Sequence, residues 1–455
     1  MSKIEVNTID VQCGSTLTVG SSGKTVTLAS GASQSGFGRT GTVDWCTTAK
    51  TSPFTAVSGD GFFVNTTSGA ITVTLPSSPS AGDIIALKDY ANTWDTNNVT
   101  VARNGSKING QCSCATLKTE SQSVTLIYVD GTKGWQDIQD STSNVTGQSY
   151  VTATGGTVTT SGDYKIHTFT SDANFVVSCA GNASGSDKVS YMVIAGGGAG
   201  SSGLGSNAGG GGGAGGFREG KCSSDPYTDS PLDAGAGLSV PAATYPITVG
   251  GGGAAQPSSG GRGAQGSTST FSTISSAGGG AGGAGSSTPG PKDGGNGGSG
   301  GGKAGSDVPG NNQVAGTGNT PPVSPPQGQP GGGGTSTPGT SGDKEGFGGG
   351  GATEAGQVGE SAAGQSGRGG AGATTSINGT PTQRAGGGAG GAGAGGSSGT
   401  ASGGGGTGSF GSSVNNGNAG TANTGGGGGG GANGAPSNGN AGGSGIVIIR
   451  YKYQN

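Results

Sequence analysis

The sequence is short of the side chains that normally build a large hydrophobic core. Aromatic residues make up 5% of the 455 positions, charged residues 10% and hydrophobic residues 28%. No apolar run is long enough to cross a bilayer, and the polar N-terminal stretch Met1–Thr8 lacks the apolar segment of a signal peptide. We therefore expect no membrane insertion and no secretion signal.

An excess of charge of either sign is absent too. The 21 Lys and Arg residues stand against 24 Asp and Glu residues, which gives a net charge of −3. No basic run occurs, so the electrostatic feature that draws proteins to nucleic acid or to anionic membranes is missing. Nucleic acid is therefore not expected as a partner.

Catalytic motifs are equally scarce, and we expect neither an enzyme nor a cofactor. His167 is the only histidine, and no nucleophile elbow precedes it, so a Ser-His-Asp triad is not predicted. The GxGxxG strings lie in a glycine-rich tract, where chance produces them. Asp225, Asp229 and Asp233 lie close together beside prolines. A solvated acidic loop is the preferred interpretation of these carboxylates, with a calcium-binding loop as the alternative.

The six cysteines are scattered along the chain. Only Cys112 and Cys114 lie close together, and on a strand their thiols would share one face. The second CxxC motif or the histidines of a structural zinc site are missing. Small, partly buried free thiols are the preferred interpretation, and no metal is expected.

Glycine is what the sequence has in abundance. There are 112 glycines in the chain, and the 91 that follow Ala195 make up about a third of the last 260 residues. The tract 196–443 can bury few side chains, so it is either disordered or packed through its backbone. Collagen does not fit, because no Gly-X-Y register persists. The ordered alternative is a bundle of polyglycine-II helices, in which closely packed backbones exchange hydrogen bonds.

The two segments that bracket the tract favour the ordered alternative. Residues 189–195 enter it and residues 446–453 leave it, and both are rich in β-forming residues. If these segments pair, the tract is one long excursion that leaves a sheet and returns to it. The sequence therefore predicts a polyglycine-II bundle over 196–443, closed by a strand pair.

Residues 1–44 are predicted to form an oligomeric β stalk with a linker. Two short alternating strands place Leu17 and Val19, and then Val26 and Leu28, on one face. Strands this short are marginally stable alone, so several copies of the chain are expected to bury these side chains around a shared axis. A homotrimer is the simplest such assembly.

Residues 45–140 are predicted to form a β-sandwich-like module, and 141–195 a small β domain completed by 446–453. Turn signals separate expected strands at 61–65, 71–75, 83–87, 98–101 and 124–129. Trp94, Trp135 and Tyr90 are interpreted as core or subunit-interface aromatics. The predicted fold class is thus an all-β N-terminal half followed by the glycine bundle, with essentially no α-helix.

Three features together resemble tail-fibre proteins of tailed phages, particularly phages of marine bacteria. They are the leader Ser2–Ile9, the module from Gly61 to Trp135, and the frame that runs from His167 to Gly198 and resumes at Ser444–Arg450. The glycine tract is also similar to the tip adhesin of T-even-type phages. That resemblance implies a polyglycine-II bundle whose distal loops contact the host receptor. This chain departs from the tip adhesins by carrying its own β-rich N-terminal half.

The resemblance implies a virion protein that attaches to the phage tail or an adaptor through its N-terminus and binds a host surface receptor. Inserts that interrupt the glycine pattern supply the candidate contacts, because function is commonly carried on loops of a rigid scaffold. The first long insert, Phe217–Asp233, is expected to form the receptor-facing tip. The candidate receptor-binding residues are Phe217, Arg218, Asp225, Tyr227, Asp229, Phe347, Arg384 and Phe410.

Two alternatives stay open at this point. One is that the phenylalanines only fill the edge of the bundle and contact no receptor. The other is a non-viral protein, either an extracellular filament or an ice-binding glycine bundle. An ice-binding face requires a flat array of threonines, which the irregular inserts disfavour.

Overall fold

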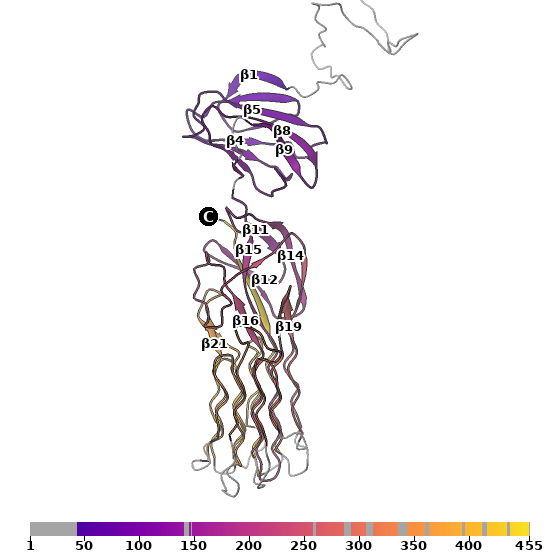
Figure 1. Cartoon of the computed structure of the whole chain (residues 1–455), viewed down its shortest axis with the longest axis vertical. Helices are drawn as coiled ribbons and strands as arrows, with labels where there is room; N and C mark the ends of the chain where they lie inside the picture. The colour runs from indigo at the N-terminus through magenta and orange to yellow at the C-terminus, as the bar shows by residue number, and fades with distance from the viewer. Residues whose placement is uncertain are drawn as a thin grey trace, which may run out of the picture.

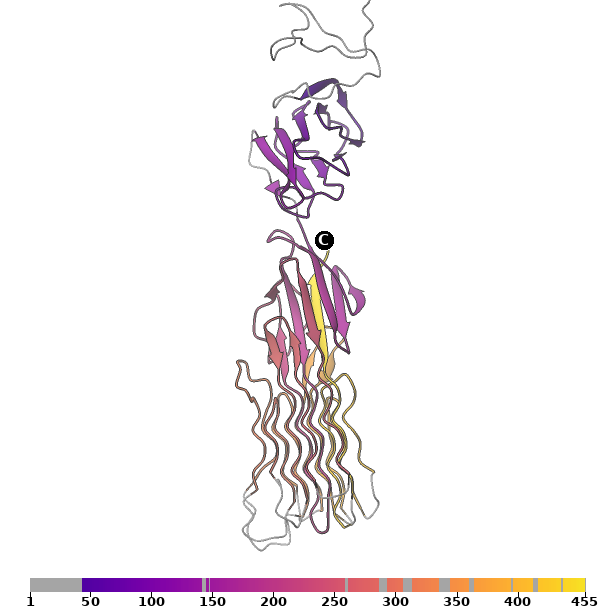
Figure 2. The same cartoon turned by 90° about the vertical axis from the view of Figure 1, so that its right-hand side faces the viewer.

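The computed structural model describes residues 43–140, 145–146, 148–257, 261–285, 293–305, 313–334, 344–359, 364–393, 396–411, 416–434 and 437–454. Every regular element in these residues is a β-strand, so the predicted all-β class is confirmed. A β-sandwich, a second sheet unit and the glycine bundle follow one another along an elongated molecule (Figures 1 and 2). The predicted stalk with Leu17, Val19, Val26 and Leu28 lies outside the described residues.

The first unit is a sandwich of two five-stranded sheets, ordered β1-β3-β5-β8-β9 and β10-β7-β6-β4-β2. Its strands are β1 (Asp44–Lys50), β2 (Phe54–Thr55), β3 (Asp60–Val64), β4 (Ile71–Thr74), β5 (Ile84–Asp89), β6 (Val99–Ala102), β7 (Ala115–Leu117), β8 (Ser123–Asp130), β9 (Gly134–Asp140) and β10 (Val145–Thr146). The first six strands alternate between the sheets and pair in parallel within each, so the chain winds around the core as a coil.

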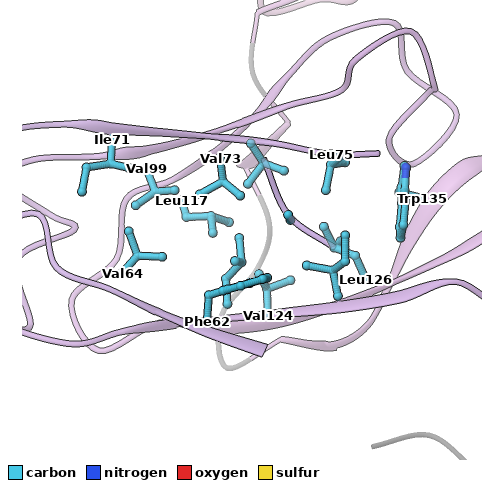
Figure 3. Packing of buried hydrophobic residues seen from close by; sticks show 14 of the residues in the cluster. Phe62, Val64, Ile71, Val73, Leu75, Val99, Leu117, Val124, Leu126 and Trp135 are labelled. Atoms are coloured by element: carbon cyan, nitrogen blue, oxygen red, sulfur yellow. The ribbon is translucent and has the colours of Figure 1, made fainter. Parts of the chain in front are cut away.

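Alternating apolar residues form the core of this sandwich. Ile71 and Val73 of one sheet face Phe62 and Val64 of the other (Figure 3), as the period of two in a strand requires. Trp94 and Trp135 are completely buried in the same core, in agreement with the sequence-based interpretation, whereas Tyr90 is 57% exposed and takes no part in it.

The second unit also has two layers. One sheet has the order β11-β14-β18-β19-β20 and the other the order β12-β13-β23-β15-β16. The short strand β17 also pairs with β15. Its strands are β11 (Val151–Thr154), β12 (Thr157–Ser161), β13 (Tyr164–Phe169), β14 (Ala173–Ala180), β15 (Lys188–Ile194), β16 (Phe217–Gly220), β17 (Leu238–Ser239), β18 (Thr244–Thr248), β19 (Ser269–Phe271), β20 (Ile274–Ser276) and β23 (Ile446–Lys452). A small hairpin, β21 (Ala373–Thr375) with β22 (Thr382–Arg384), lies beside this unit at the near end of the bundle (Figure 1).

The strand pair predicted to close the glycine tract is confirmed. β15 and β23 are antiparallel neighbours, with Ser190 opposite Arg450 and Ile194 opposite Ile446. β23 is buried on both faces: Val447 belongs to the core between the two sheets, and Ile448 to a second cluster on the opposite face. This double burial explains why the return segment is a continuous apolar run rather than an alternating one.

The glycine tract is an ordered bundle of extended segments joined by backbone hydrogen bonds. Residues 208–216 show the pattern best, because three successive amides donate to three different neighbours. Gly211 donates to Phe347, Gly212 to Gly428 and Gly213 to Gly280, at 2.9, 2.8 and 2.8 Å. A segment whose hydrogen bonds turn through three directions in three residues has the three-residue screw of the polyproline-II conformation.

The pattern repeats along the whole of segment 208–216. Every third amide of this segment donates to the same neighbouring segment, and the acceptor carbonyls are also three residues apart. The amides of 208, 211 and 214 donate to the carbonyls of 344, 347 and 350. Those of 209, 212 and 215 donate to 431, 428 and 425, and those of 210, 213 and 216 to 283, 280 and 277. The carbonyls of 208–216 accept from three further segments, 195–201, 299–305 and 386–391. The segment is therefore surrounded on all sides, and hydrogen bonds satisfy its buried amides without any side chains.

Candidate binding surface at the distal end of the bundle

The chain leaves the sheets at Ala195, and its first turn away from them is a tight hairpin at Leu204–Asn207. Leu204 N donates to Asn207 O at 3.0 Å, and Asn207 N donates back to Leu204 O at 3.3 Å. Gly205 has a φ of 61°, a conformation that glycine adopts without strain. Segment 208–216 then returns directly to β16, so this hairpin marks the distal end of the bundle.

A second described turn contacts this hairpin. Gly434 N donates to Gly205 O at 2.6 Å, and the side-chain amide of Asn433 donates to Ser206 O at 3.1 Å. The Leu204–Asn207 hairpin, which joins the first two segments of the bundle, is thereby fixed to Asn433 and Gly434, which precede the last segment. Gly205, Ser206 and Gly434 are exposed around these contacts. Their backbone polar groups therefore lie on a surface whose conformation these hydrogen bonds fix.

Charged residues lie beside the hairpin. Lys344 O accepts from Ala208 N at 3.0 Å, which places the start of segment 344–350 at the distal end. The neighbouring Glu345 carboxylate accepts from Gly393 N at 2.6 Å. Burial raises the pKa of the Glu345 carboxyl, and the backbone amide of Gly393 opposes that rise. The half-buried Glu345 side chain thus holds the distal end of the segment that ends at Gly393.

Phe410 supplies an exposed aromatic ring at the same end. It follows Ser409, whose amide donates to Gly430 at 2.8 Å, close to the Asn433 turn. Phe410 and Asn416 close their own turn through two reciprocal bonds of 2.8 Å. The ring is 42% exposed. We use the term distal surface for Leu204–Asn207, Lys344, Glu345, Phe410, Asn416, Asn433 and Gly434.

The prediction that the Phe217–Asp233 insert forms the distal tip is wrong. Phe217–Gly220 is β16 and pairs with β15, with Phe217 opposite Ile194 and Arg218 opposite Val193. Phe217 is 1% exposed and packs in the cluster on the outer face of the sheet. The prediction requires a single outward run before Phe217, whereas the chain has already turned at Leu204–Asn207 and come back.

Asp225 is buried, which corrects its interpretation as part of a solvated loop. Its carboxylate forms an ion pair with Arg450 Nε at 2.8 Å, and the two side chains are 2% and 4% exposed. The second carboxylate oxygen accepts from Ser190 Oγ at 3.0 Å. Tyr227 is 6% exposed, and the centre of its ring lies 5.6 Å from Cζ of the same Arg450 guanidinium. Burial, and then the neighbouring Glu219 carboxylate, raise the pKa of the Tyr227 phenol far above its ordinary value.

The other two carboxylates of the insert have partners of their own. Asp229 pairs with Lys221 Nζ at 2.8 Å, and the Lys221 hydrogen bond is the main cause that lowers the pKa of Asp229. Asp233 accepts from the Lys221 amide at 2.8 Å. Among the described residues, no group of three or more His, Cys, Asp and Glu side chains is placed to hold a metal ion.

The remaining candidates separate into buried and exposed residues. Arg384 lies in β22 opposite Ala373, 7% exposed and away from the distal end. Phe347 is 6% exposed inside the bundle, where the ammonium of Lys303 lies 4.3 Å from the centre of its ring. For Phe217 and Phe347 the packing interpretation therefore holds, and of the three phenylalanines only Phe410 is at a distal turn and exposed.

His167 is a structural residue. It is completely buried, with Nδ1 2.7 Å from Gly155 O and Nε2 3.0 Å from the Tyr451 hydroxyl. Burial lowers the pKa of the imidazole. In the part of the chain that the structure describes, no helix is long and apolar enough to cross a membrane.

The distal hairpin belongs to the candidate surface but is not among the residues expected from the sequence. Its signal is nevertheless present, because Leu204-Gly-Ser-Asn207 interrupts two glycine runs with the residue types that favour turns. The interruption is short and carries no charge, so it stands out less than the longer inserts.

Comparison with protein families agrees with this architecture. A family model described as a glycine-rich domain matches residues 168–452, from the end of β13 to the end of the return strand β23. A comparison with curated proteins gives no match. The matched range covers more than half of the sequence, and the chain therefore belongs to this glycine-rich domain family.

Proposed function

We propose that the protein is a virion tail fibre that attaches to a phage tail through its N-terminal part and binds a host-cell receptor through the distal surface. The observation that carries this proposal is the form of the bundle. Its backbone hydrogen bonds build a rigid support, the two-layer sheet unit closes one end (Figure 2), and Leu204–Asn207 meets Asn433 and Gly434 at the other. Loops held on a rigid scaffold are a common way to build a recognition surface.

The chemistry of the distal surface suits recognition better than catalysis. It offers an exposed aromatic ring at Phe410, backbone groups at Gly205 and Gly434, and charges of both signs at Lys344 and Glu345. Aromatic rings anchor binding when they enter a pocket or stack on a partner, and preformed polar groups give specificity around them. Because the turns bond to one another, little conformational entropy is lost on binding.

The proposal places the receptor contacts at the distal surface and not at the Phe217–Asp233 insert. That insert is tied to the sheet by the Asp225–Arg450 ion pair and has a structural role. In the assembled fibre, several copies of the chain, most simply three, would present their distal surfaces together toward the host cell. Multivalency of this kind raises the overall affinity without any new contact.

The proposal is tested by binding of the labelled full-length protein to a panel of bacteria, together with immunogold labelling of phage particles. We expect label on the virion tail, and saturable binding to a restricted set of hosts. Phe410→Ala should weaken cell binding about ten-fold, the usual cost of losing an aromatic anchor. The matched control is Tyr90→Ala, an exposed aromatic on the sandwich, which should bind normally.

Three results would contradict the proposal. Label on cellular filaments and none on virions would favour an extracellular structural protein. Unchanged cell binding by Phe410→Ala and by a variant with Leu204–Asn207 replaced by Gly-Ser-Gly-Asn would show that the distal surface does not make the contact. Thermal hysteresis in freezing solutions, without cell binding, would identify an ice-binding protein instead.

A further inference from the structure

The junction between the sandwich and the second unit brings together two cysteines that lie far apart in the sequence. Cys112 belongs to the sandwich, in the connection between β6 and β7, and Cys179 lies on β14 opposite Thr152 of β11. Both line one cleft of about 380 Å³. The two thiols are near enough across the junction for each to influence the pKa of the other.

The two thiols have different chemical environments. Cys179 is buried, and its sulfur lies 3.6 Å from Ser149 Oγ. Burial alone would raise the pKa of Cys179, but hydrogen bonds from the Gly181 backbone, Cys112 and Ser149 lower it overall. Burial raises the pKa of Cys112. A thiol with a lowered pKa beside one with a raised pKa is the arrangement of an attacking and a resolving cysteine.

The walls of the cleft are cationic. Arg103 and Lys107 line it together with Gly105, Ser106 and the two cysteines, and none of the described residues lining it is acidic. Positive charge stabilises a thiolate and attracts small anionic disulfides. The cleft has a volume of about 380 Å³ and is the route by which solvent and small oxidants approach the two thiols.

We propose that Cys112 and Cys179 form a reversible disulfide that joins the sandwich to the second unit. The oxidant is a small acidic disulfide such as glutathione disulfide. The Cys179 thiolate attacks one of its sulfurs, expels a glutathione thiolate and becomes a mixed disulfide. Cys112 then gives up its proton, attacks the Cys179 sulfur and expels the second glutathione. The protein loses two electrons and two protons, and the oxidant is reduced to two glutathione molecules.

The cross-link follows the redox state of the surroundings. The cytoplasm keeps thiols reduced, and an extracellular medium allows disulfides to persist. The two units are therefore joined covalently in an oxidising medium and carry separate thiols in a reducing one. This inference concerns the junction alone and holds whether or not the protein is a tail fibre.

The neighbouring Cys114 provides a matched control. It lies two residues from Cys112 and lines an adjacent cleft of about 360 Å³, which Cys112 also borders and which does not include Cys179. A disulfide formed only because a thiol is close and accessible could use Cys114, whereas the proposed geometry requires Cys112.

Peptide mapping of the intact chain tests the proposal directly. The purified protein is equilibrated in glutathione buffers of stepped redox potential, alkylated and digested with trypsin without reduction. Trypsin releases Cys112 and Cys114 in the peptide Ile108–Lys118, and Cys179 in Ile166–Lys188. We expect these peptides to be joined in oxidising buffer and separated after reduction, with fragmentation assigning the bond to Cys112. Cys114→Ser should keep the joined species, and Cys112→Ser and Cys179→Ser should lose it completely.

Three outcomes would overturn the proposal. The first is a bond between Cys112 and Cys114 within the one peptide. The second is a joined species that survives in Cys112→Ser. The third is retention of free thiols at Cys112 and Cys179 in wild-type protein both at the most oxidising potential and after treatment with a smaller dithiol-specific oxidant. The smaller oxidant is included because its reaction does not require glutathione disulfide to enter the cleft.

Discussion

Gly212→Ala is the substitution that most sharply probes how the bundle is held together. Gly212 lies in the surrounded segment 208–216, donates to Gly428 O at 2.8 Å and accepts from Gly388 N at 2.9 Å. A Cβ added at this position would lie 2.1 Å from Gly198 O and 2.6 Å from the carbon of the same carbonyl. The obstacle is backbone, so no side-chain rotation can relieve it.

The expected destabilisation follows from the displacement that the methyl group requires. Ordinary contact begins at 3.4 Å, so the neighbouring segment would have to move by about 1.3 Å. Overpacking of this kind costs about 1–3 kcal/mol. The movement also strains hydrogen bonds worth about 1 kcal/mol each. We therefore expect a loss of roughly 3 kcal/mol in the free energy of unfolding and a midpoint lowered by roughly 5–10 °C.

Thermal and denaturant unfolding of Gly212→Ala measures this loss, with Gly251→Ala as the matched control. Gly251 belongs to another segment of the bundle, and a Cβ added there meets no atom within 4 Å. Gly251→Ala should be neutral or slightly stabilising, because alanine restricts the unfolded chain. If both variants unfold at the wild-type midpoint, the backbones are not in close contact and the account of the bundle is refuted.

Two further predictions concern the sheet unit. Asp225→Asn should cost about 3–5 kcal/mol in denaturant unfolding, because it leaves the Arg450 guanidinium buried without its partner. The double variant with Arg450→Met should recover part of that loss, and equal losses in the two variants would contradict this explanation. Burial lowers the pKa of His167 below its ordinary value of 6.5, so the unfolded chain binds the proton more tightly than the folded chain. Stability should then fall as the pH drops below about 6.5, by up to about 1.4 kcal/mol per pH unit. His167→Asn should remove this component of the pH dependence, and an unchanged pH profile would count against it.

The sequence predicts well the strands whose apolar and polar side chains follow a recognisable pattern. Alternating or continuous apolar runs between turn signals locate β3, β4, β5, β6 and β8. The pair β15 and β23 is also predictable, because each strand is apolar over several residues and each lies at one end of the glycine tract. β1 escapes prediction because Asp44–Lys50 is polar, and its pattern of exposed and half-buried residues gives no periodic signal.

The features that could not be predicted depend on the path of the chain through the bundle. Glycine runs carry no pattern that marks where a segment reverses, so the direction of the chain at Phe217 cannot be read from the sequence. The burial of Asp225 is hidden for a different reason. Its partner Arg450 lies 225 positions away, and only the closing of the tract by β23 brings the two together.

The most direct test of the central claim is hydrogen exchange of the glycine amides in segment 208–216, measured by NMR on full-length protein labelled with ¹⁵N-glycine. These amides are donors to the three neighbouring segments. The account predicts exchange slower than in a random coil by about a thousand-fold or more, which corresponds to about 4 kcal/mol of protection. Exchange at random-coil rates in the intact protein would show that the glycine tract is disordered and would contradict the hydrogen-bonded bundle.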